Sequence, residues 1–374
     1  MKKCLFLIES LKIGGAERAL VTLLKSIDKS KYDITVLSIV DGGSFSEEIK
    51  SIKGLRYKYI ASKKSSILDK LKIKMIYRWF SPEAIYKLFV PRNNDVEIAF
   101  CEGLTTKIIG SSTNTKAKHI AWVHTDLKDN NWPVNCGVFS SLEEEISYYN
   151  KFDNVVGVSN TVCERLFDLI KSKNITRVYN LVDKEFICEK ANEVSDFTLY
   201  QGKINIVSVG RLETVKGFDR LVNVVSKLVD VGYDNFSLII VGGGSLMGRL
   251  SDLLHKKKLD HIVTLTGQKD NPYAIMKGRD LFVCPSRNEG FNIAIAEAMI
   301  LGLPVVSTWC PGPNEILQDG KYGILCDNNE DGLYQAIKEI LDNPSLLQKY
   351  AKLSICRTTM FEKGPILNQL YQLI

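Results

Sequence analysis

Short runs of apolar residues alternate with stretches of helical periodicity along the whole chain. In the first half these runs cover 4–8, 34–40, 96–100, 119–123 and 154–158, and in the second half 204–209, 236–241, 262–266, 280–284 and 304–308. The runs are predominantly apolar and do not alternate with polar residues, which is typical of strands buried on both faces of a parallel sheet. Helical segments between such strands predict an α/β chain with two doubly wound, Rossmann-like parallel sheets.

The length and a polar segment over 182–203 predict two domains, because 374 residues exceed one ordinary core. We expect an N-terminal domain over 1–183, a C-terminal domain over 184–355 and a connection within 182–203. We expect a helical tail over 356–374 that breaks near Gly364 and returns to the N-terminal domain. In open sheets of this kind ligands bind outside the carboxyl ends of the strands, so the two sets of loops predict one cleft between the domains.

The net charge of +6 lies in the N-terminal half, where residues 1–183 hold 28 Lys and Arg against 21 Asp and Glu. An excess of this size suits an anionic lipid surface or a diphosphate ligand, and the chain has none of the usual nucleic-acid-binding motifs. No apolar run approaches the roughly 18 residues of a membrane span. The nine cysteines are dispersed without a C-x-x-C pair, which indicates reduced cytosolic thiols and neither a disulfide framework nor a zinc site.

Two cations follow the strand over 204–209 in the segment VGRLETVKGF, which contains Arg211 and Lys216. Arginine presents a planar fork to phosphate oxygens and lysine presents a compact charge, so the pair can neutralise a leaving diphosphate. Most basic residues on loops are simply solvated. Their place at the carboxyl end of a strand favours a phosphate-binding role here.

Two carboxylates follow the strand over 280–284 in the segment RNEGFNIAIAEAM, which contains Glu289 and Glu297. We expect a helix that begins at Phe291, which places the two carboxylates about 10 Å apart along its rise. That separation fits the hydroxyls of a sugar and of a ribose. The N–H groups at the start of the helix are expected to meet the ligand's diphosphate or sugar, and the expected donor-binding set here is Gly290, Phe291, Asn292 and Ile293.

Two other segments at strand ends carry candidate chemistry. Gly14 and Gly15 precede a helix, where they either let the backbone approach a ligand closely or form a plain turn. His124 follows the strand over 119–123 and can be a general base, a hydrogen-bond donor to a sugar or a buried structural residue. The glycines of VGGGSLMG, at 242–248, have the wrong spacing for a dinucleotide-binding loop.

The most basic segment is 53–78, with nine Lys and Arg against one acidic residue. On a helix over 66–80, one face would carry the apolar residues Leu68, Leu71, Met75, Ile76 and Trp79, and another the cations Lys70, Lys74 and Arg78. This pattern predicts either an interfacial helix that binds an anionic membrane surface or lipid headgroup, or an ordinary surface helix with a wet basic side.

These motifs together resemble glycosyltransferase family 4, whose members are retaining enzymes with the GT-B fold of two Rossmann-like domains facing across a cleft. The resemblance rests on GGAER, HTDL, GVSN, NLVD, VGRLETVKGFDRL, the segment from GQKDN to IAEAM, and GPNEIL, in the family's order over residues 1 to about 340. It implies that Arg211 and Lys216 hold the donor diphosphate and that Glu289 contacts the donor sugar. It implies further that Glu297 contacts the ribose and that His124 touches the donor sugar.

The resemblance also implies a function in bacterial capsule, exopolysaccharide or lipid-linked oligosaccharide synthesis. The expected reaction moves a hexose or N-acetylhexosamine from a UDP-sugar to a polyprenyl-diphosphate-linked or other glycan acceptor, with retention and without a metal or other cofactor. The glycine loop at Gly14–Gly15 would close over the diphosphate. The enzyme would be cytoplasmic and peripherally associated with the inner face of the membrane, through Lys70, Lys74 and Arg78.

Two other functions fit the same residues. A nucleotide-sugar epimerase or hydrolase on the same scaffold would consume the donor without a glycan acceptor. A non-catalytic protein would bind the sugar nucleotide and show no turnover. The basic helix favours the transferase over both alternatives, because only the transferase needs a lipid-linked acceptor.

Overall fold

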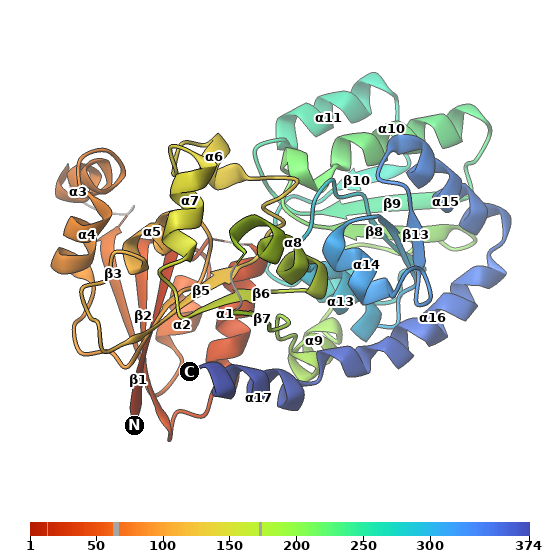
Figure 1. Ribbon diagram of the computed structural model, residues 1–374. Coiled ribbons are helices and arrows are strands. Elements are labelled where there is room, and N and C mark those ends of the chain that lie inside the picture. The colour runs from red at the N-terminus through yellow and green to blue at the C-terminus, as the bar shows by residue number, and fades with distance from the viewer. Residues whose placement is uncertain (13, 63–66, 172–173) are drawn as a thin grey trace. The chain divides into compact units, whose positions relative to one another are not determined.

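The computed structural model describes residues 1–12, 14–62, 67–171 and 174–374 (Figure 1). The chain forms two compact units. The N-terminal unit comprises Met1–Leu181 with Lys363–Ile374, and the C-terminal unit comprises Val182–Glu362. Each unit contains one sheet whose paired strands are all parallel, with helices on its faces. The structure thus confirms the predicted class of two Rossmann-like parallel-sheet domains.

The N-terminal unit has a seven-stranded sheet in the order β3-β2-β1-β4-β5-β6-β7. Its strands are β1 (Lys2–Ser10), β2 (Tyr32–Asp41), β3 (Leu55–Ser62), β4 (Val96–Ala99), β5 (Lys118–Val123), β6 (Asn154–Gly157) and β7 (Ile175–Arg177). Its helices are α1 (Gly15–Ser26), α2 (Ser46–Lys50), α3 (Ile67–Arg78), α4 (Pro82–Phe89), α5 (Leu104–Ile109), α6 (Trp132–Asn135), α7 (Leu142–Tyr149), α8 (Asn160–Ile170) and α17 (Lys363–Leu373).

The C-terminal unit has a six-stranded sheet in the order β10-β9-β8-β11-β12-β13. Its strands are β8 (Ile204–Val209), β9 (Phe236–Val241), β10 (Val263–Leu265), β11 (Leu281–Cys284), β12 (Val305–Thr308) and β13 (Ile324–Cys326). Its helices are α9 (Lys184–Ala191), α10 (Phe218–Asp230), α11 (Met247–Lys256), α12 (Pro272–Met276), α13 (Ile293–Ile300), α14 (Pro311–Leu317), α15 (Glu330–Asp342) and α16 (Ser345–Arg357), with short 3₁₀ turns at Thr214–Lys216 and Thr358–Phe361.

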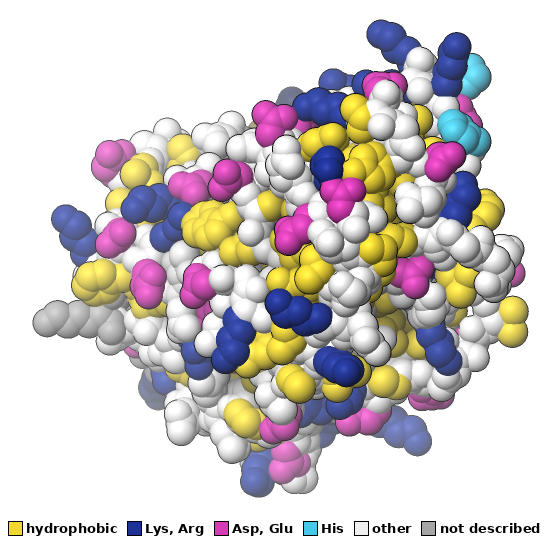
Figure 2. Space-filling view, turned by 90° about the vertical axis from the view of Figure 1, so that its right-hand side faces the viewer, with side chains coloured by type: hydrophobic (Ala, Val, Ile, Leu, Met, Phe, Trp, Pro, Cys, Tyr) yellow, Lys and Arg dark blue, Asp and Glu magenta, His cyan; other side chains and the backbone are white. Residues whose placement is uncertain are grey.

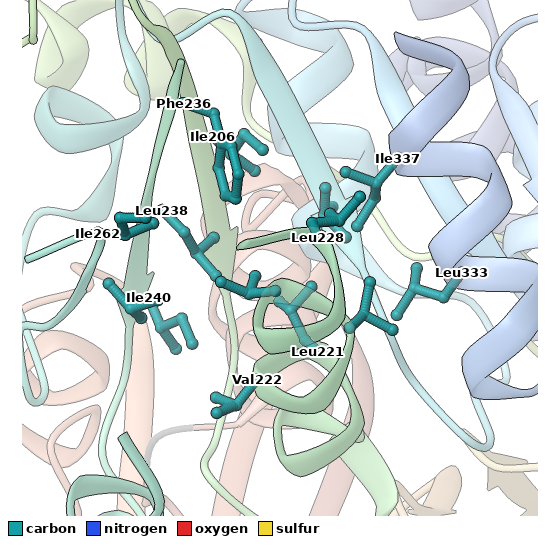
Figure 3. Close-up of a cluster of buried hydrophobic side chains, with 14 of the residues drawn as sticks. Ile206, Leu221, Val222, Leu228, Phe236, Leu238, Ile240, Ile262, Leu333 and Ile337 are labelled. Carbon is teal, nitrogen blue, oxygen red and sulfur yellow. The ribbon is translucent and has the colours of Figure 1, made fainter. Parts of the chain in front are cut away.

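The core of the C-terminal unit forms where α10 packs between the sheet and α15 (Figure 3). Apolar residues recur along α10 with a spacing of three and four, so they share one face of the helix. Leu221 and Leu228 of this face meet Leu333 and Ile337 of α15, and all four are at most 1% exposed. Helix α10 begins at Phe218, two residues after Lys216. Its buried apolar contacts hold it against the sheet and so hold the end of the loop that carries Lys216.

Two expectations about the chain's connections need correction. Segment 182–203 belongs to the C-terminal unit, where α9 packs against α12 and α13. The tail does not break at Gly364, because Gly364 and Pro365 lie in the first turn of α17, where proline fits a helix without losing a hydrogen bond. The break comes before it, at Thr358–Glu362. Within the N-terminal unit, Tyr371 of α17 stacks on Tyr32 with ring centroids 5.4 Å apart.

The molecular surface mixes charges of both signs. On the face drawn in Figure 2, Lys and Arg side chains are interspersed with Asp and Glu and with apolar side chains. No helix within the described ranges is long and apolar enough to cross a membrane.

A buried carboxylate lies inside the N-terminal sheet. Glu97 of β4 is 0% exposed and accepts hydrogen bonds from Tyr86, Asn94 and Ser112 at 2.9–3.0 Å. His119 of β5 lies 3.4 Å from it. Burial alone would raise the pKa of Glu97, but His119 and the three donors together outweigh burial and lower that pKa below its ordinary value.

We therefore predict that Glu97 makes folding stability depend on acidity. Because its folded-state pKa is lowered, its contribution is present above the unfolded-state pKa and is lost as pH falls through the folded-state value. Glu97→Gln should cost about 1.5–3 kcal/mol at pH 7, and the difference from the parent should narrow below about pH 4. Urea denaturation at pH 7, 5 and 3.5 measures this, and a deficit that stays constant with pH would contradict it.

Candidate active site

The candidate site lies at the point where the strand order of the C-terminal sheet reverses. From β8 the chain moves outward through β9 and β10, and β11 then returns to pair with β8 before β12 and β13 extend the other side. Ligands of open α/β sheets bind at this reversal, outside the carboxyl ends of the strands. The loops that leave β8 and β11 carry the predicted cations and the first predicted glutamate.

The structure brings Lys216 and Glu289 into direct contact, although they are 73 residues apart in the chain. The Lys216 Nζ lies 2.6 Å from Glu289 Oε1. Ser286 Oγ donates a second hydrogen bond to the same oxygen at 2.6 Å. Glu289 is 8% exposed and Ser286 is 2% exposed, so the carboxylate is held in a largely desolvated position.

Three further contacts fasten the same two loops. The Arg287 guanidinium forms two hydrogen bonds with the Asp219 carboxylate, at 2.7 and 2.9 Å. The backbone N–H of Arg287 donates to Val215 at 2.7 Å. Buried Arg220 donates through Nε and Nη2 to the carbonyl of Pro285, at 3.0 and 2.8 Å. The pair Lys216–Glu289 therefore lies between two backbones whose separation is fixed independently of it.

Gly217 makes this close approach possible. Its φ of +69° lies in the left-handed region, where a side chain is strained. A Cβ at this position would lie 2.0 Å from the carbonyl oxygen of Pro285. Any larger residue would therefore push the loop that carries Lys216 away from the loop that carries Glu289.

Arg211 follows β8 by two residues and is exposed. Its neighbour Glu213 accepts hydrogen bonds from the hydroxyl and the backbone N–H of Ser245, at 2.6 and 3.0 Å. These bonds, and to a lesser extent the charge of Arg211, lower the pKa of Glu213. The loop after β8 is thus tied to the loop after β9 as well, while the Arg211 guanidinium faces solvent.

The predicted helix after Glu289 begins at Ile293, two residues later than expected. Asn292 precedes it with φ of +72°, a left-handed conformation that ends the loop and is outside the helix. Its side-chain oxygen accepts from the N–H of Ile295 at 3.1 Å, and its amide donates to Cys284 Sγ at 3.1 Å. Phe291 is 2% exposed as a whole residue, so both its side chain and its backbone are buried.

Glu297 lies in α13 and is 8% exposed. Tyr273 of α12 donates its hydroxyl to Glu297 Oε1 at 2.8 Å. The two glutamates are therefore held by different partners, Glu289 by a cation and a serine and Glu297 by a tyrosine. That difference suits two separate roles.

The N-terminal unit carries the remaining predicted site residues. Gly14, with φ of −171°, caps α1, and Gly15 is the first residue of that helix, which is the first helix after β1. A Cβ on Gly14 would lie 2.2 Å from the carboxylate of Glu17. A side chain at position 14 would therefore displace the Glu17 carboxylate from the start of α1.

His124 directly follows β5 and is inaccessible at both ring nitrogens, which have no hydrogen-bond partner among the described residues. Burial lowers the pKa of His124 to about 4, although the charge of Glu102 opposes that shift. The imidazole is therefore neutral at pH 7. Glu102 itself accepts hydrogen bonds from the His124 backbone N–H at 3.0 Å, from Thr125 at 2.8 Å and from the Trp132 indole at 3.2 Å.

The expected amphipathic division of the basic helix is only partly right. In α3, Ile76 is 3% exposed and belongs to the core, but Leu71 is 45% and Trp79 63% exposed. The side chain of Leu68 lies outside the described part. The buried side is formed by Ile73, Ile76 and, after the helix, Phe80. Lys70, Lys74 and Arg78 are exposed as expected, so cations and apolar residues share the outer surface.

Residues 189–354 match the family described as Glycosyl transferases group 1. The C-terminal unit is a glycosyltransferase group 1 domain. The chain is similar over its length to the N-acetylgalactosamine-N,N'-diacetylbacillosaminyl-diphospho-undecaprenol 4-alpha-N-acetylgalactosaminyltransferase of Campylobacter jejuni, with 28% identity over 98% of this chain and 97% of that protein. An uncharacterized glycosyltransferase of Methanocaldococcus jannaschii is 29% identical over 68% of this chain and 66% of that protein.

Solved structures identify the fold of the whole chain as GT-B. S. aureus TarM has a TM-score of 0.78 at 15% identity, covering 100% of this chain and 99% of that chain. Anabaena HepE in complex with UDP and glucose has a TM-score of 0.76 at 18% identity, with the same coverage. At these identities the likeness concerns the fold alone.

The sequence did not predict the residues that support the candidate site through contacts between its loops. The contacts of Arg287 with Asp219 and of Arg220 with Pro285 join segments about 70 residues apart, and no local sequence pattern predicts contacts of this kind. Glu102 could have been predicted from the sequence, because it follows an apolar strand at the edge of the sheet where ligands bind. Gly217 could have been predicted too, since a glycine between a cation and a helix is typical of a left-handed turn.

We predict that Gly217→Ala separates the two loops and lowers turnover by up to about a hundredfold, the cost of displacing a catalytic group by roughly 1 Å. Gly232→Ala is the matched control, because Gly232 has φ of +95° but nothing within 4 Å of its Cβ position. Both variants carry left-handed strain, and only the first meets a carbonyl. Equal turnover in the two variants, measured at saturating donor, would show that the close approach does not matter.

Proposed function

We propose that this glycosyltransferase moves a hexose or N-acetylhexosamine from a UDP-sugar to a polyprenyl-diphosphate-linked or other glycan acceptor, with retention at the anomeric carbon. The observation that carries the proposal is the contact between Lys216 and Glu289 at the strand reversal of the C-terminal sheet, beside exposed Arg211. It brings together a cation, which suits a phosphate, and a carboxylate, which suits a sugar hydroxyl. A sugar attached to a diphosphate is the ligand that needs both.

In this proposal Arg211 and Lys216 stabilise the charge that develops on the leaving diphosphate. Preorganised charge of this kind is the main catalytic contribution when the leaving group is an oxyanion, and it can take the part that a metal ion has in other enzymes. Glu289 orients the donor sugar, and Glu297 takes the ribose hydroxyls. The N–H groups of Gly290, Asn292 and Ile293 donate hydrogen bonds to the sugar nucleotide near the start of α13. The N–H of Ile295 already donates to the side chain of Asn292.

The N-terminal unit supplies the acceptor side of the reaction. We propose that the neutral imidazole of His124 touches the donor sugar, which requires a rearrangement that exposes its buried ring nitrogens. Gly14 and Gly15 bring backbone N–H groups to the diphosphate. The acceptor hydroxyl attacks from the face on which the diphosphate leaves. The departing phosphate oxygen takes its proton, so no enzyme carboxylate is required as a nucleophile.

The lipid-linked acceptor and a role in bacterial surface polysaccharide synthesis are supported by two observations. The relative from Campylobacter jejuni is named for a diphospho-undecaprenol acceptor. In this chain, α3 exposes Lys70, Lys74 and Arg78 together with Leu71 and Trp79. Basic and aromatic side chains on one surface are typical of proteins that bind peripherally to anionic membranes. We place the enzyme at the cytoplasmic face of the membrane on this ground.

The position of α3 within its unit agrees with this role. Tyr77 of α3 donates its hydroxyl to Glu9 at 2.6 Å, and Glu9 lies at the carboxyl end of β1. The basic helix is therefore tied to the edge of the sheet from which the glycine loop also emerges. A membrane-bound acceptor held by α3 would thus approach the edge at which parallel sheets bind ligands.

A panel assay tests the reaction itself. The protein is incubated with UDP-glucose, UDP-galactose and their N-acetylated forms, with and without a bacterial membrane lipid extract, and the products are resolved by mass spectrometry. A lipid-linked product with an added sugar supports the transferase. Donor consumption without the extract indicates the epimerase or hydrolase, and binding without any turnover indicates a sugar-nucleotide-binding protein.

We predict that Arg211→Ala and Lys216→Ala each lower turnover by about 10²- to 10³-fold, the range for loss of one preorganised donor to a developing anion. Lys227→Ala is the control, because Lys227 is a half-exposed cation of α10 that pairs with Asp331 away from the loops. Initial rates at saturating donor and acceptor measure the effect. Near-parental rates in both site variants would remove the assignment of these cations.

We predict that replacing Lys70, Lys74 and Arg78 with Ser weakens binding to anionic vesicles by about 3 kcal/mol, at roughly 1 kcal/mol per basic residue. The Michaelis constant for the lipid acceptor should rise while donor affinity stays unchanged. Replacing Lys256, Lys257 and Lys258 in the C-terminal unit removes the same charge and serves as the control. If both triple variants sediment with vesicles as the parent does, α3 is an ordinary solvated helix.

A further inference from the structure

The contact between Lys216 and Glu289 opposes the proposed role of Lys216, which is to bind the diphosphate of the donor. A cation that is to receive a diphosphate is already neutralised, with its Nζ 2.6 Å from Glu289 Oε1. The side chains are 24% and 9% exposed respectively, so water screens the attraction only in part. A diphosphate that enters without a sugar must compete with Glu289 for Lys216 and must also lie close to a carboxylate of like charge.

The two oxygens of Glu289 are used differently. Oε1 accepts from both Lys216 and Ser286 at 2.6 Å. Among the residues that the structure describes, none donates a hydrogen bond to Oε2. The Oε2 atom of Glu289 can therefore accept a hydrogen bond from a ligand while Oε1 is held by Lys216 and Ser286. A hydroxyl that donates to this carboxylate spreads its charge and weakens its hold on Lys216.

The two loops that carry Lys216 and Glu289 cannot move apart to break this ion pair. The bonds Arg287–Asp219 and Arg220–Pro285 hold the two backbones together whether or not the ion pair is formed. The ammonium can therefore change partner only by a rotation of the Lys216 side chain. Exposed Arg211 forms no ion pair as close as that of Lys216 within the described ranges, although the charge of Glu213 lies near it, so its guanidinium is more accessible to a phosphate.

We infer that Glu289 is an internal counter-ion that makes the site discriminate between a sugar nucleotide and a bare nucleoside diphosphate. Without a sugar, Glu289 holds Lys216 and disfavours the diphosphate. When a sugar hydroxyl donates to Glu289, Lys216 is released to the phosphate, so the sugar and the diphosphate bind cooperatively through one ion pair. After transfer the sugar is gone, Glu289 recaptures Lys216, and the nucleoside diphosphate is expelled. This inference rests on the proposed function and assigns Glu289 a specificity-determining role in it.

The test is calorimetric titration of the parent, Glu289→Gln and Lys216→Met with UDP and with UDP-glucose. Glutamine keeps the size of Glu289 and removes its charge, so UDP should bind the Glu289→Gln variant about tenfold more tightly than the parent, because like charges placed together oppose binding. UDP-glucose should gain no affinity, because the sugar loses its charged acceptor. The ratio of the two dissociation constants should therefore shift by at least about tenfold toward UDP.

Two comparisons separate this effect from simpler ones. Glu297→Gln should weaken both ligands alike and leave their ratio unchanged, because its expected contact is with the ribose that they share. In the double variant of Lys216→Met and Glu289→Gln, the gain in UDP affinity should vanish relative to Lys216→Met alone. A gain that persists there would show general repulsion and overturn the role of the ion pair, as would an unchanged ratio in Glu289→Gln itself.

The outcome also separates this inference from the proposed function. If UDP binds the parent and the ratio does not change in Glu289→Gln, the counter-ion role is wrong while sugar-nucleotide binding stands. If none of UDP, ADP and GDP binds any variant, the proposed donor class is wrong and the inference falls with it. Melting temperatures of all variants, measured without ligand, show that each protein compared is folded.

Discussion

The structure of the candidate site depends on the fastening of two loops across the strand reversal of the C-terminal sheet. Parallel strands β8 and β11 are neighbours, and each ends in a loop that turns into a helix. Sheet pairing brings the loops near one another but does not fix their separation. That is set by Arg287–Asp219, by Arg220–Pro285 and by the absence of a side chain at Gly217. Only within this frame can Lys216 and Glu289 meet at 2.6 Å.

The frame is charged as well as rigid, and its charges are arranged in a definite order. Asp219 and Arg287 neutralise each other on the outer side of the loops, where both are about one-third exposed. Arg220 is buried and satisfied by carbonyl oxygens. The charge that can respond to a ligand is therefore concentrated in Arg211, Lys216 and Glu289. The backbones that carry these three side chains are held in place, so only the side chains themselves rearrange when a ligand's charge arrives.

The sequence predicts the sheets well because their central strands contain runs of apolar residues, as CLFLI in β1 and LIIV in β9 show. It missed β3, β7 and β13, which lie at sheet edges or are only half-buried. An edge strand needs few apolar residues, so β3, with the sequence LRYKYIAS, resembles a charged loop. In the sequence, Arg56 and Lys58 of this segment count only as part of a basic stretch. For α3, periodicity grouped Ile76 with Leu71 and Trp79 on one apolar face, whereas in the structure only Ile76 of these three is buried in the core.

In the candidate site, too, some residues could be predicted from the sequence and others only from the fold. Residues at the carboxyl ends of strands were predictable, because the crevice rule needs only the strands and the next few residues. The partners were not predictable, because a hydrogen bond between Glu289 and Ser286 or an ion pair with Lys216 depends on side-chain directions that exist only in the fold. This matters for mechanism. Read from sequence, Lys216 and Glu289 are two independent ligand contacts, whereas in the structure each is the other's partner, and a ligand must address both at once.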